Sequence, residues 1–216
     1  FASNRRNERR DDILSYFKTH FQVSNIFHDF LNYELDNKFL EGTGSMVLDR
    51  VHKIAYACIS NRTEKKLFEE WCDKMHFTPL SFYADDQGHP VYHTNVLMSV
   101  CENLVFICLE AVVGLDVRQR LLDCFYESNK EVVVISKSQM RNFLGNVLEI
   151  QNTQGESFLV MSTSAFEALD NAQKNIINKK IKILHSPLNT IEYFGGGSAR
   201  CMIAEIFLKP NNSILS

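Results

Sequence analysis

Apolar residues recur along this chain with the spacing of helices in some segments and of strands in others. Residues 7–21 place apolar side chains on one side and charged side chains opposite, which predicts an amphipathic helix. The apolar side consists of Ile13, Leu14, Phe17 and Phe21. Residues 25–37 repeat this pattern more weakly, residues 46–59 predict a pair of strands, and residues 63–75 predict another helix.

The rest of the chain alternates short apolar runs, typical of strands, with amphipathic segments, typical of helices. Further strands are predicted at residues 78–83, 95–113 (two strands with a turn near Glu102), 131–136, 146–151, 157–161, 180–184, 190–194 and 202–208. Further helices are predicted at residues 117–128, 137–144 and 163–178. Several connections are too short for a crossover between parallel strands. We therefore expect an α/β (α+β) fold of small mixed ββαβ units in a single domain over residues 1–216, and not one doubly wound sheet.

Composition and charge argue against several classes of protein. The 216 residues are 45% apolar, which is enough for one substantial core. A formal charge of −3 argues against general nucleic-acid binding, which needs a basic surface. The longest apolar run, residues 104–113, is interrupted by Glu110 and is too short to cross a membrane. No signal-peptide pattern follows Phe1, so we expect a cytoplasmic protein, and the absence of an initial methionine suggests the chain begins part-way through a longer one.

The six cysteines predict free thiols, because they form no CxxC pair and five of them lie in apolar runs or on a predicted helix. Those five are Cys58, Cys72, Cys101, Cys108 and Cys124. Buried thiols in a reducing cytoplasm explain them better than disulfides or zinc ligands do. The histidines show no zinc-like spacing, and we expect no metal. Cys201 differs from the other five, since it follows a run of glycines.

The segment GGGSARC, residues 195–201, is the first candidate for chemistry. Three glycines allow a tight loop with exposed backbone amides. A thiol at the end of that loop, beside the guanidinium of Arg200, would be accessible and favoured as a thiolate. A glycine turn followed by a buried cysteine explains the segment equally well. Dinucleotide binding fits poorly, because the GxGxxG spacing fails and the glycines do not open a βαβ unit.

His93 and Glu41 are candidate partners of such a thiol. His93 lies between a polar loop and a buried strand, a position at the rim of a core where sites commonly form. A nucleophilic cysteine needs a histidine as base or ion-pair partner, and that histidine needs an orienting carboxylate, for which Glu41 is the candidate. A structural histidine and a solvated glutamate in a turn are the alternatives.

The segments LEGTGS, SNRT, YHTN, SQMRNFLGN and GGGSARCM occur in this order, and together they resemble the pentein, or guanidine-modifying, superfamily over essentially the whole chain. The superfamily includes arginine deiminases, dimethylarginine dimethylaminohydrolases and amidinotransferases. NRRNERR and GGGSARCMIAEIFL are most similar to the bacterial citrulline-utilisation hydrolases. The resemblance implies a five-bladed propeller of ββαβ modules around a polar central site. Members carry further sequence before NRRNERR, so we expect this chain to lack the N-terminal module and to have weak or no activity alone.

The resemblance also implies roles for three residues. Cys201 in GGGSARC would be the nucleophile, His93 in YHTN the general acid and base, and Glu41 in LEGTG would orient His93. The sequence departs from the superfamily's motif where Gly44 and Ser45 stand in place of a second acidic residue. That departure puts a second carboxylate in doubt but does not affect Glu41.

Four arginines and one asparagine are candidate substrate-binding residues. Arg5 or Arg6 in NRRNERR and Arg62 in SNRT resemble arginines that hold the substrate's α-carboxylate by bidentate pairing. A solvated basic helix start explains the first pair equally well. Arg200, beside the nucleophile, is a further candidate. Asn95 stands where deiminases have the aspartate of a His-x-Asp motif, and its amide suits a neutral ureido group better than a cationic guanidinium.

The predicted function is therefore cysteine-dependent hydrolysis of a carbon–nitrogen bond. The thiolate would attack the ureido or guanidino carbon of a citrulline- or arginine-type amino acid, with citrulline to ornithine favoured and no cofactor needed. The alternatives are an inactive or regulatory pentein-fold binding protein, and a hydrolase of arginine or dimethylarginine. The expected partner is a small amino-acid substrate, with neither nucleic acid nor membrane. The sequence leaves open whether the protein forms a homo-oligomer.

Overall fold

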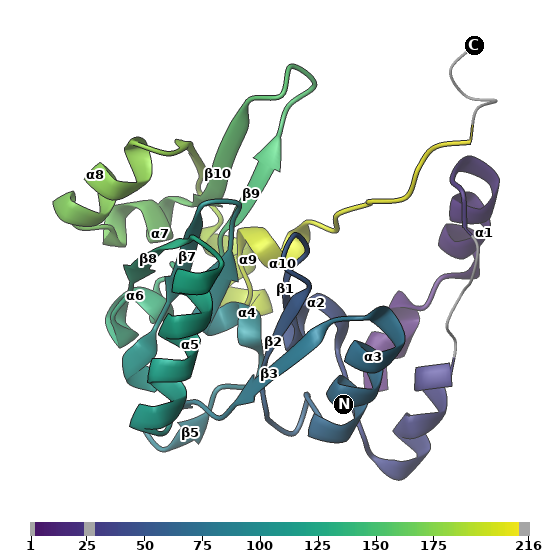
Figure 1. Cartoon of the computed structure of the whole chain (residues 1–216). Helices are drawn as coiled ribbons and strands as arrows, with labels where there is room; N and C mark the ends of the chain where they lie inside the picture. The colour runs from purple at the N-terminus through teal and green to yellow at the C-terminus, as the bar shows by residue number, and fades with distance from the viewer. Residues whose placement is uncertain (1–2, 24–28, 212–216) are drawn as a thin grey trace.

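Three sheets with the same internal plan form most of the structure (Figure 1), a computed structural model that describes residues 3–23 and 29–211. In each sheet an antiparallel strand pair is followed by helical structure and by a third strand, which runs parallel to the second. Module 1 consists of β1 (Val47–Asp49), β2 (Ile54–Cys58), α3 (Lys65–Met75) and β3 (Thr78–Phe82). Module 2 consists of β6 (Met98–Val100), β7 (Leu104–Ile107), α5 (Leu115–Glu127) and β8 (Glu131–Val134). Module 3 consists of β9 (Leu148–Gln151), β10 (Ser157–Ser162), α7 (Thr163–Ala168), α8 (Asn171–Asn178) and β11 (Lys182–Ser186). The predicted ββαβ units are confirmed.

Short elements connect the modules and form the two ends of the described chain. They are η1 (Ser3–Glu8), α1 (Asp11–His20), η2 (Asp29–Asp36), α2 (Gly42–Ser45), β4 (Asp85–Asp86), β5 (His89–Pro90), α4 (Thr94–Leu97), η3 (Leu109–Ala111), α6 (Lys137–Arg141), α9 (Asn189–Gly195) and α10 (Ala199–Met202). Three of them, α2, α4 and α10, carry or immediately follow the predicted catalytic residues.

The modules share one apolar core. β7 is buried over its whole length and has a neighbouring strand on each side, which explains its uninterrupted apolar run LVFI. Phe106 of this strand, Tyr56 of β2 and Phe125 of α5 are fully buried. The ring centroids of Tyr56 and Phe125 are 5.4 Å apart, so module 1 packs directly against the helix of module 2.

A buried ion pair also joins modules 1 and 2. Nζ of Lys130 lies 3.1 Å from Oδ2 of Asp49, and each side chain is 2% exposed. The ammonium donates further hydrogen bonds to the carbonyl oxygens of Cys101 and Glu102, both at 3.0 Å. Burial raises the pKa of Asp49, but hydrogen bonds from the His52 backbone and from Lys130 outweigh burial, so this pKa lies below its ordinary value. The buried charges are thus paired and hydrogen-bonded.

The first strand of each module borders one shared cavity. β1, β6 and β9 line a space of about 620 Å³ together with Ile203 and residues 205–207. Asn95 and Arg200 also lie in its wall. The propeller-like arrangement therefore brings one edge of each sheet to a common centre, beside the predicted site.

Two of the predicted strands are wrong. Residues 190–194 lie in the helix α9, and residues 202–208 begin in α10 and continue without a sheet partner. Both stretches are rich in β-branched and aromatic residues, which favour strands. A strand also needs a neighbour for its backbone N–H and C=O groups, and none of the described strands pairs with these stretches.

The single helix predicted at residues 163–178 is two helices. The Asp170 side chain accepts from the Gln173 backbone N–H at 2.8 Å, and the Gln173 side chain accepts from the Asp170 N–H at 3.1 Å. This reciprocal capping box starts α8 and separates it from α7.

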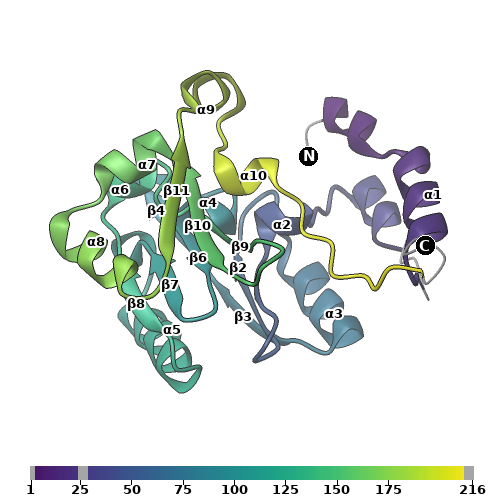
Figure 2. The same ribbon diagram turned by 90° about the horizontal axis from the view of Figure 1, so that it is seen from above.

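The N-terminal helices lie to one side of the modules, next to α3 (Figure 2). The predicted amphipathic helix is confirmed over α1, but no side chain of α1 is buried. Backbone bonds join this end to the other: Gln22 N–H donates to Lys209 O at 2.8 Å, and Asn211 N–H donates to His20 O at 2.9 Å. Of the weaker pattern at 25–37, the later part forms η2, and residues 24–28 lie outside the described residues.

Within the described ranges, no helix combines the length and the apolarity that crossing a bilayer requires. The single-domain assignment over residues 1–216 and the missing N-terminal module stay predictions.

Candidate active site

Two short helices begin at the residues that form one side of the site. Glu41 immediately precedes α2, and His93 immediately precedes α4. Figure 2 shows α2 and α4 close to α10 at the centre of the molecule. Oε2 of Glu41 lies 2.7 Å from Nε2 of His93, and the two side chains are 15% and 9% exposed. The structure thus brings the predicted acid–base pair together.

Burial and hydrogen bonding act on Glu41 in opposite directions. Burial raises the pKa of its carboxyl, and the hydrogen bond with His93 is the largest of the effects that lower it. The pKa of Glu41 lies below its ordinary value as a result, so the carboxyl is ionised at neutral pH. An ionised carboxylate at Nε2 favours the imidazole tautomer with its hydrogen on Nε2.

The two residues that depart from the superfamily's motif support this pair. A Cβ atom on Gly44 would lie 2.7 Å from Nδ1 and Cε1 of His93, which is closer than real atoms approach. The Ser45 hydroxyl accepts from Glu41 N–H at 2.8 Å and donates to Arg62 O at 2.9 Å. Gly44 therefore leaves room for the imidazole, and Ser45 ties the Glu41 backbone to the loop of Arg62.

Arg62 lies beside the same carboxylate. Its Nη1 is 3.9 Å from Oε2 of Glu41, and its side chain is 28% exposed. The guanidinium carbon lies 4.8 Å from the ring centroid of Tyr92. The Tyr92 hydroxyl donates to Gly196 O at 3.0 Å, which connects this side of the site to the glycine loop.

Cys201 lies on α10, directly after the glycine loop, and is exposed. Its Sγ accepts from Nδ2 of Asn95 at 3.5 Å and from Nδ2 of Asn146 at 3.2 Å. Asn95 follows His93 by two residues, so one short segment contacts both Glu41 and the sulfur. The buried Oδ1 of Asn95 has no hydrogen-bond partner in the described part of the chain. An unused acceptor therefore lies next to the thiol.

The other five cysteines are free, as predicted; four are buried and Cys124 is half-buried. Burial raises the pKa of Cys58 and of Cys72 to about 12, and that of Cys108 to about 11. Those thiols are protonated at neutral pH. Of the six, Cys201 is the one that is exposed, so solvent, a reagent or a substrate can reach it.

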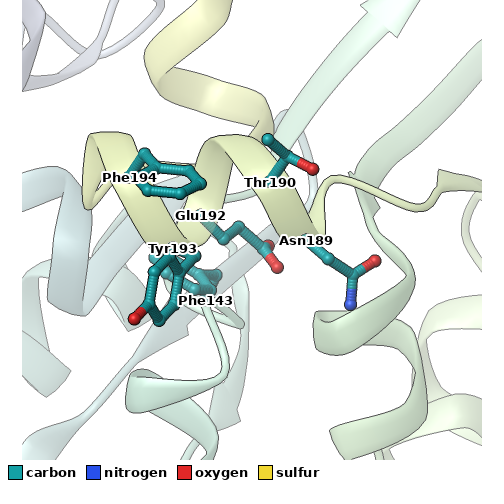
Figure 3. A pocket seen from close by; sticks show the side chains of 6 residues that line it. All are labelled: Phe143, Asn189, Thr190, Glu192, Tyr193 and Phe194. Atoms are coloured by element: carbon teal, nitrogen blue, oxygen red, sulfur yellow. The ribbon is translucent and has the colours of Figure 1, made fainter.

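A buried carboxylate holds the glycine loop. Glu192 of α9 is among the residues that line an open cavity of about 610 Å³ (Figure 3). One of its oxygens accepts from the Ser198 hydroxyl at 2.7 Å, and the other accepts from the Ser164 hydroxyl at 2.8 Å. Ser198 is fully buried and immediately precedes α10. These bonds anchor the loop three residues before the nucleophile.

The remaining predicted residues have other partners. The Arg200 guanidinium donates to Ile203 O at 3.0 Å and to Glu205 Oε2 at 3.2 Å. The expectation that it stabilises the thiolate is therefore wrong for this arrangement, because neighbouring residues on a helix point in different directions. Arg6 pairs with Glu34 at 3.2 Å in the N-terminal segment. Arg5 lies in η1, and its side chain is outside the described part.

Asn146 and Glu192 are site residues that the sequence patterns did not single out. A usable signal existed for Asn146, which is a lone polar residue in the apolar run FLGNVL. Such a residue is 2% exposed here, and a buried amide needs partners. In the described ranges no group of three or more His, Cys, Asp or Glu side chains is arranged to hold a metal ion.

Comparison with known proteins gives a family and a fold. The family model described as "N,N dimethylarginine dimethylhydrolase, eukaryotic" matches residues 1–208. No curated protein matches the chain. The chain is similar to the N-terminal domain of ArgZ, an arginine dihydrolase from the ornithine–ammonia cycle in cyanobacteria, with a TM-score of 0.58 and 17% identity over 74% of this chain and 54% of that one. It is also similar to AgrE in its ternary complex with ornithine and NAD+, with a TM-score of 0.60 and 20% identity over 80% of this chain and 24% of that one.

The chain thus spans about half the length of the ArgZ domain, 54%, and at these identities the likeness shows the fold. The predicted pentein superfamily and its α/β propeller fold are confirmed, and so is the relation to the dimethylarginine hydrolases. The closer similarity to citrulline-utilisation hydrolases stays a prediction. Since the family model covers residues 1–208, the chain belongs to the eukaryotic N,N dimethylarginine dimethylhydrolase family.

Proposed function

We propose that this protein hydrolyses a carbon–nitrogen bond at the guanidino or ureido carbon of an arginine-type amino acid. One observation carries the proposal: residues 93–95 contact both the Glu41 carboxylate and the exposed Cys201 thiol. A nucleophile and an acid–base group on one short segment can act on the same carbon.

The first half of the reaction forms a covalent adduct. The Cys201 thiolate attacks the carbon, and the carbon–nitrogen bond to the departing amine breaks as that nitrogen takes a proton from His93. The enzyme is left with the carbon bonded to Sγ, as an S-carbamoyl (thiocarbamate) group from a ureido substrate or an isothiouronium group from a guanidino substrate. In the second half, His93 removes a proton from water, the hydroxide attacks the same carbon, and the carbon–sulfur bond breaks to restore the thiolate.

Glu41 supports both halves through His93. Its carboxylate at 2.7 Å from Nε2 stabilises the imidazolium and fixes the ring. Because a carboxylate that stays ionised can do this throughout the cycle, the lowered pKa of Glu41 suits this role. Gly44 gives the ring the space that it needs in this position.

The substrate is an amino acid with its α-carboxylate at Arg62. The guanidinium is partly exposed beside the site, and bidentate pairing would orient the substrate chain. Arg5 or Arg6 and Arg200 remain candidates for the same class of contact. Asn95 offers its unused Oδ1 to an N–H of the ureido or guanidino group. The cavity of about 620 Å³ has Asn95 and Arg200 in its wall but is not lined by Cys201, His93 or Arg62, so it lies next to the proposed substrate position.

Citrulline is the substrate that we favour, giving ornithine, carbon dioxide and ammonia. Asn95 supplies a neutral amide, which leaves a buried cationic guanidinium less well neutralised than an aspartate would. Arginine and dimethylarginine are the competing substrates. ArgZ is an arginine dihydrolase, and AgrE is known in complexes with L-arginine and with ornithine, which supports an amino acid of this shape.

The test is incubation of the protein with citrulline, arginine and asymmetric dimethylarginine, with ammonia, dimethylamine and the amino-acid products followed separately. Cys201→Ala is expected to lower product formation to the uncatalysed level. Cys124→Ala, which removes a half-buried thiol in α5, is the matched control and retains activity. Because this chain alone is expected to have weak or no activity, the comparison uses the full-length protein. Turnover by its Cys201→Ala variant, or no turnover of any of the three substrates by the unmodified full-length protein, overturns the proposal.

A further inference from the structure

Asn146 makes hydrogen bonds with every polar group that it has. Its N–H donates to Phe143 O at 2.9 Å, and its carbonyl oxygen accepts from Arg200 N–H at 3.3 Å. Its side-chain Oδ1 accepts from the N–H groups of Ser198 at 3.2 Å and Cys201 at 3.4 Å. Its Nδ2 donates to Asn95 O at 2.8 Å and to Sγ of Cys201 at 3.2 Å. One buried amide therefore bonds both to α4 and to the segment that carries the thiol.

The orientation of this amide follows from its partners. Backbone N–H groups can only donate, so the atom that faces Ser198 and Cys201 N–H must be the oxygen. A backbone carbonyl can only accept, so the atom that faces Asn95 O must be the NH₂ group. The group that points at the sulfur is thus a donor.

The backbone before Asn146 is packed in a way that only glycine permits. A Cβ on Gly145 would lie 2.4 Å from Val96 O and 2.8 Å from the carbonyl carbon of Leu97. This contact sets the distance between Asn146 and α4, and hence between its amide and Asn95. The amide is held in place before any ligand binds.

We propose that Asn146 is the positioning residue of the nucleophile: its Oδ1 fixes the backbone of the Cys201 turn, and its Nδ2 donates a hydrogen bond to the sulfur in its thiolate form. This rests on the function proposed above. In the described part of the chain the polar side-chain contacts of Sγ are two amide NH₂ groups, and the neighbouring Arg200 guanidinium bonds to Glu205 instead. N–H donors favour a charged acceptor over a neutral one. The two amides therefore stabilise the thiolate of Cys201, as a neighbouring cation does in other proteins with a reactive thiol.

Asn146→Asp tests the two functions of the amide separately. The substitution keeps an oxygen for the N–H groups of Ser198 and Cys201 but replaces the donor to the sulfur and to Asn95 O with a negatively charged acceptor. The readout is the rate of iodoacetamide alkylation of Cys201 as a function of pH, resolved from the other cysteines by peptide mass spectrometry. We expect the midpoint to rise by at least about one pH unit and the rate at neutral pH to fall at least about tenfold, by like-charge repulsion. Asn142→Asp is the matched control: it is exposed, four residues earlier, and should leave the profile unchanged.

If Asn146→Asp does not fold, a second measurement, made on the wild-type protein, tests the proposal. The side-chain amide resonances of Asn146 should shift with pH at the same midpoint as Cys201 alkylation. Either an unchanged alkylation profile in folded Asn146→Asp or amide resonances that do not follow the thiol titration overturns the proposal. Neither measurement uses a substrate. A protein that hydrolyses none of the three amino acids but shows both effects would refute the proposed function and retain the positioning role.

Discussion

The three modules and the two ends of the described chain have similar apolar patterns in their sequences, but the modules bury their apolar side chains and the ends leave them exposed. Residues 40–202 include fully buried side chains such as Phe106 and Tyr56, together with the Glu41–His93 pair. At the ends, α1 buries no side chain, and Ile206 and Phe207 are 50% and 61% exposed. An apolar pattern predicts which face of a helix or strand can be buried. Burial itself requires another element of the fold that packs against this face. The modules supply such neighbours to one another.

The same division separates the predicted site residues. Glu41, His93, Asn95, Arg62 and Cys201 come from the region of the modules, and the structure gathers them through measured contacts. Arg6 comes from the N-terminal end and pairs there with Glu34. The part of the site that performs the proposed bond chemistry therefore belongs to the packed region.

The largest expected difference between the two regions is in stability. Phe106→Ala removes a fully buried ring from the middle strand of module 2 and should lower the free energy of unfolding by about 3–5 kcal/mol. Phe207→Ala, at an exposed ring that stacks with Arg50, should lower it by less than about 1 kcal/mol. Urea denaturation of both variants measures this. Equal losses would show that the C-terminal segment is packed as firmly as the modules.

An intermediate effect is expected at the contact between α2 and His93. Gly44→Ala introduces a Cβ that would lie 2.7 Å from the imidazole, so the ring must move away from its place beside Glu41. We expect a loss of about 1–3 kcal/mol in stability and a fall in kcat of at least about tenfold, since a positioned acid–base group contributes about 100-fold or more. Stopped-flow or steady-state kinetics measure the loss. Cys201 alkylation is the internal control and should change much less than kcat, because the thiol lies on α10 and its shorter hydrogen bond, at 3.2 Å, comes from Asn146. An undiminished kcat would show that His93 does not act from this position.

The smallest effect is the pH dependence of the Glu41–His93 pair. The pKa of Glu41 is lower in the folded protein than in the unfolded chain, where it is about 4.3. Its contribution to stability is therefore complete above that unfolded value and is lost as the pH falls through the folded one. Glu41→Gln should be less stable than the wild type by about 1 kcal/mol at pH 7, and the difference should disappear once the pH lies below the lowered pKa of Glu41 in the folded protein. Urea midpoints of both proteins across this range check the sign. A difference that grows toward acid pH would mean that the carboxyl is held neutral.

The sequence predicts this fold where local pattern and long-range packing agree. Alternating and continuous apolar runs mark β2, β7 and β10, because each has a neighbouring strand on both sides and a face in the core. The strand-like stretches at 190–194 and 202–208 have no such neighbour, and no local rule detects that. In the site, Cys201 and His93 lie in recognisable motifs. Asn146 and Glu192 belong to the site because of their hydrogen bonds to Cys201 and Ser198. The spacing of residues along the sequence does not predict such contacts.

The buried pair between Lys130 and Asp49 has a consequence for how the molecule opens. Removing one partner from such a pair costs about 3–5 kcal/mol, because the other charge is left uncompensated away from water. Separation of module 1 from module 2 would break this ion pair, the hydrogen bonds of the ammonium to Cys101 O and Glu102 O, and the packing of Tyr56 on Phe125, so we expect the two modules to open together. The amide hydrogens of β1 and β7 should consequently exchange as one cooperative unit. The segment with His93 and Asn95 connects these two modules along the chain, so a joint opening of the modules would also disturb the reaction centre.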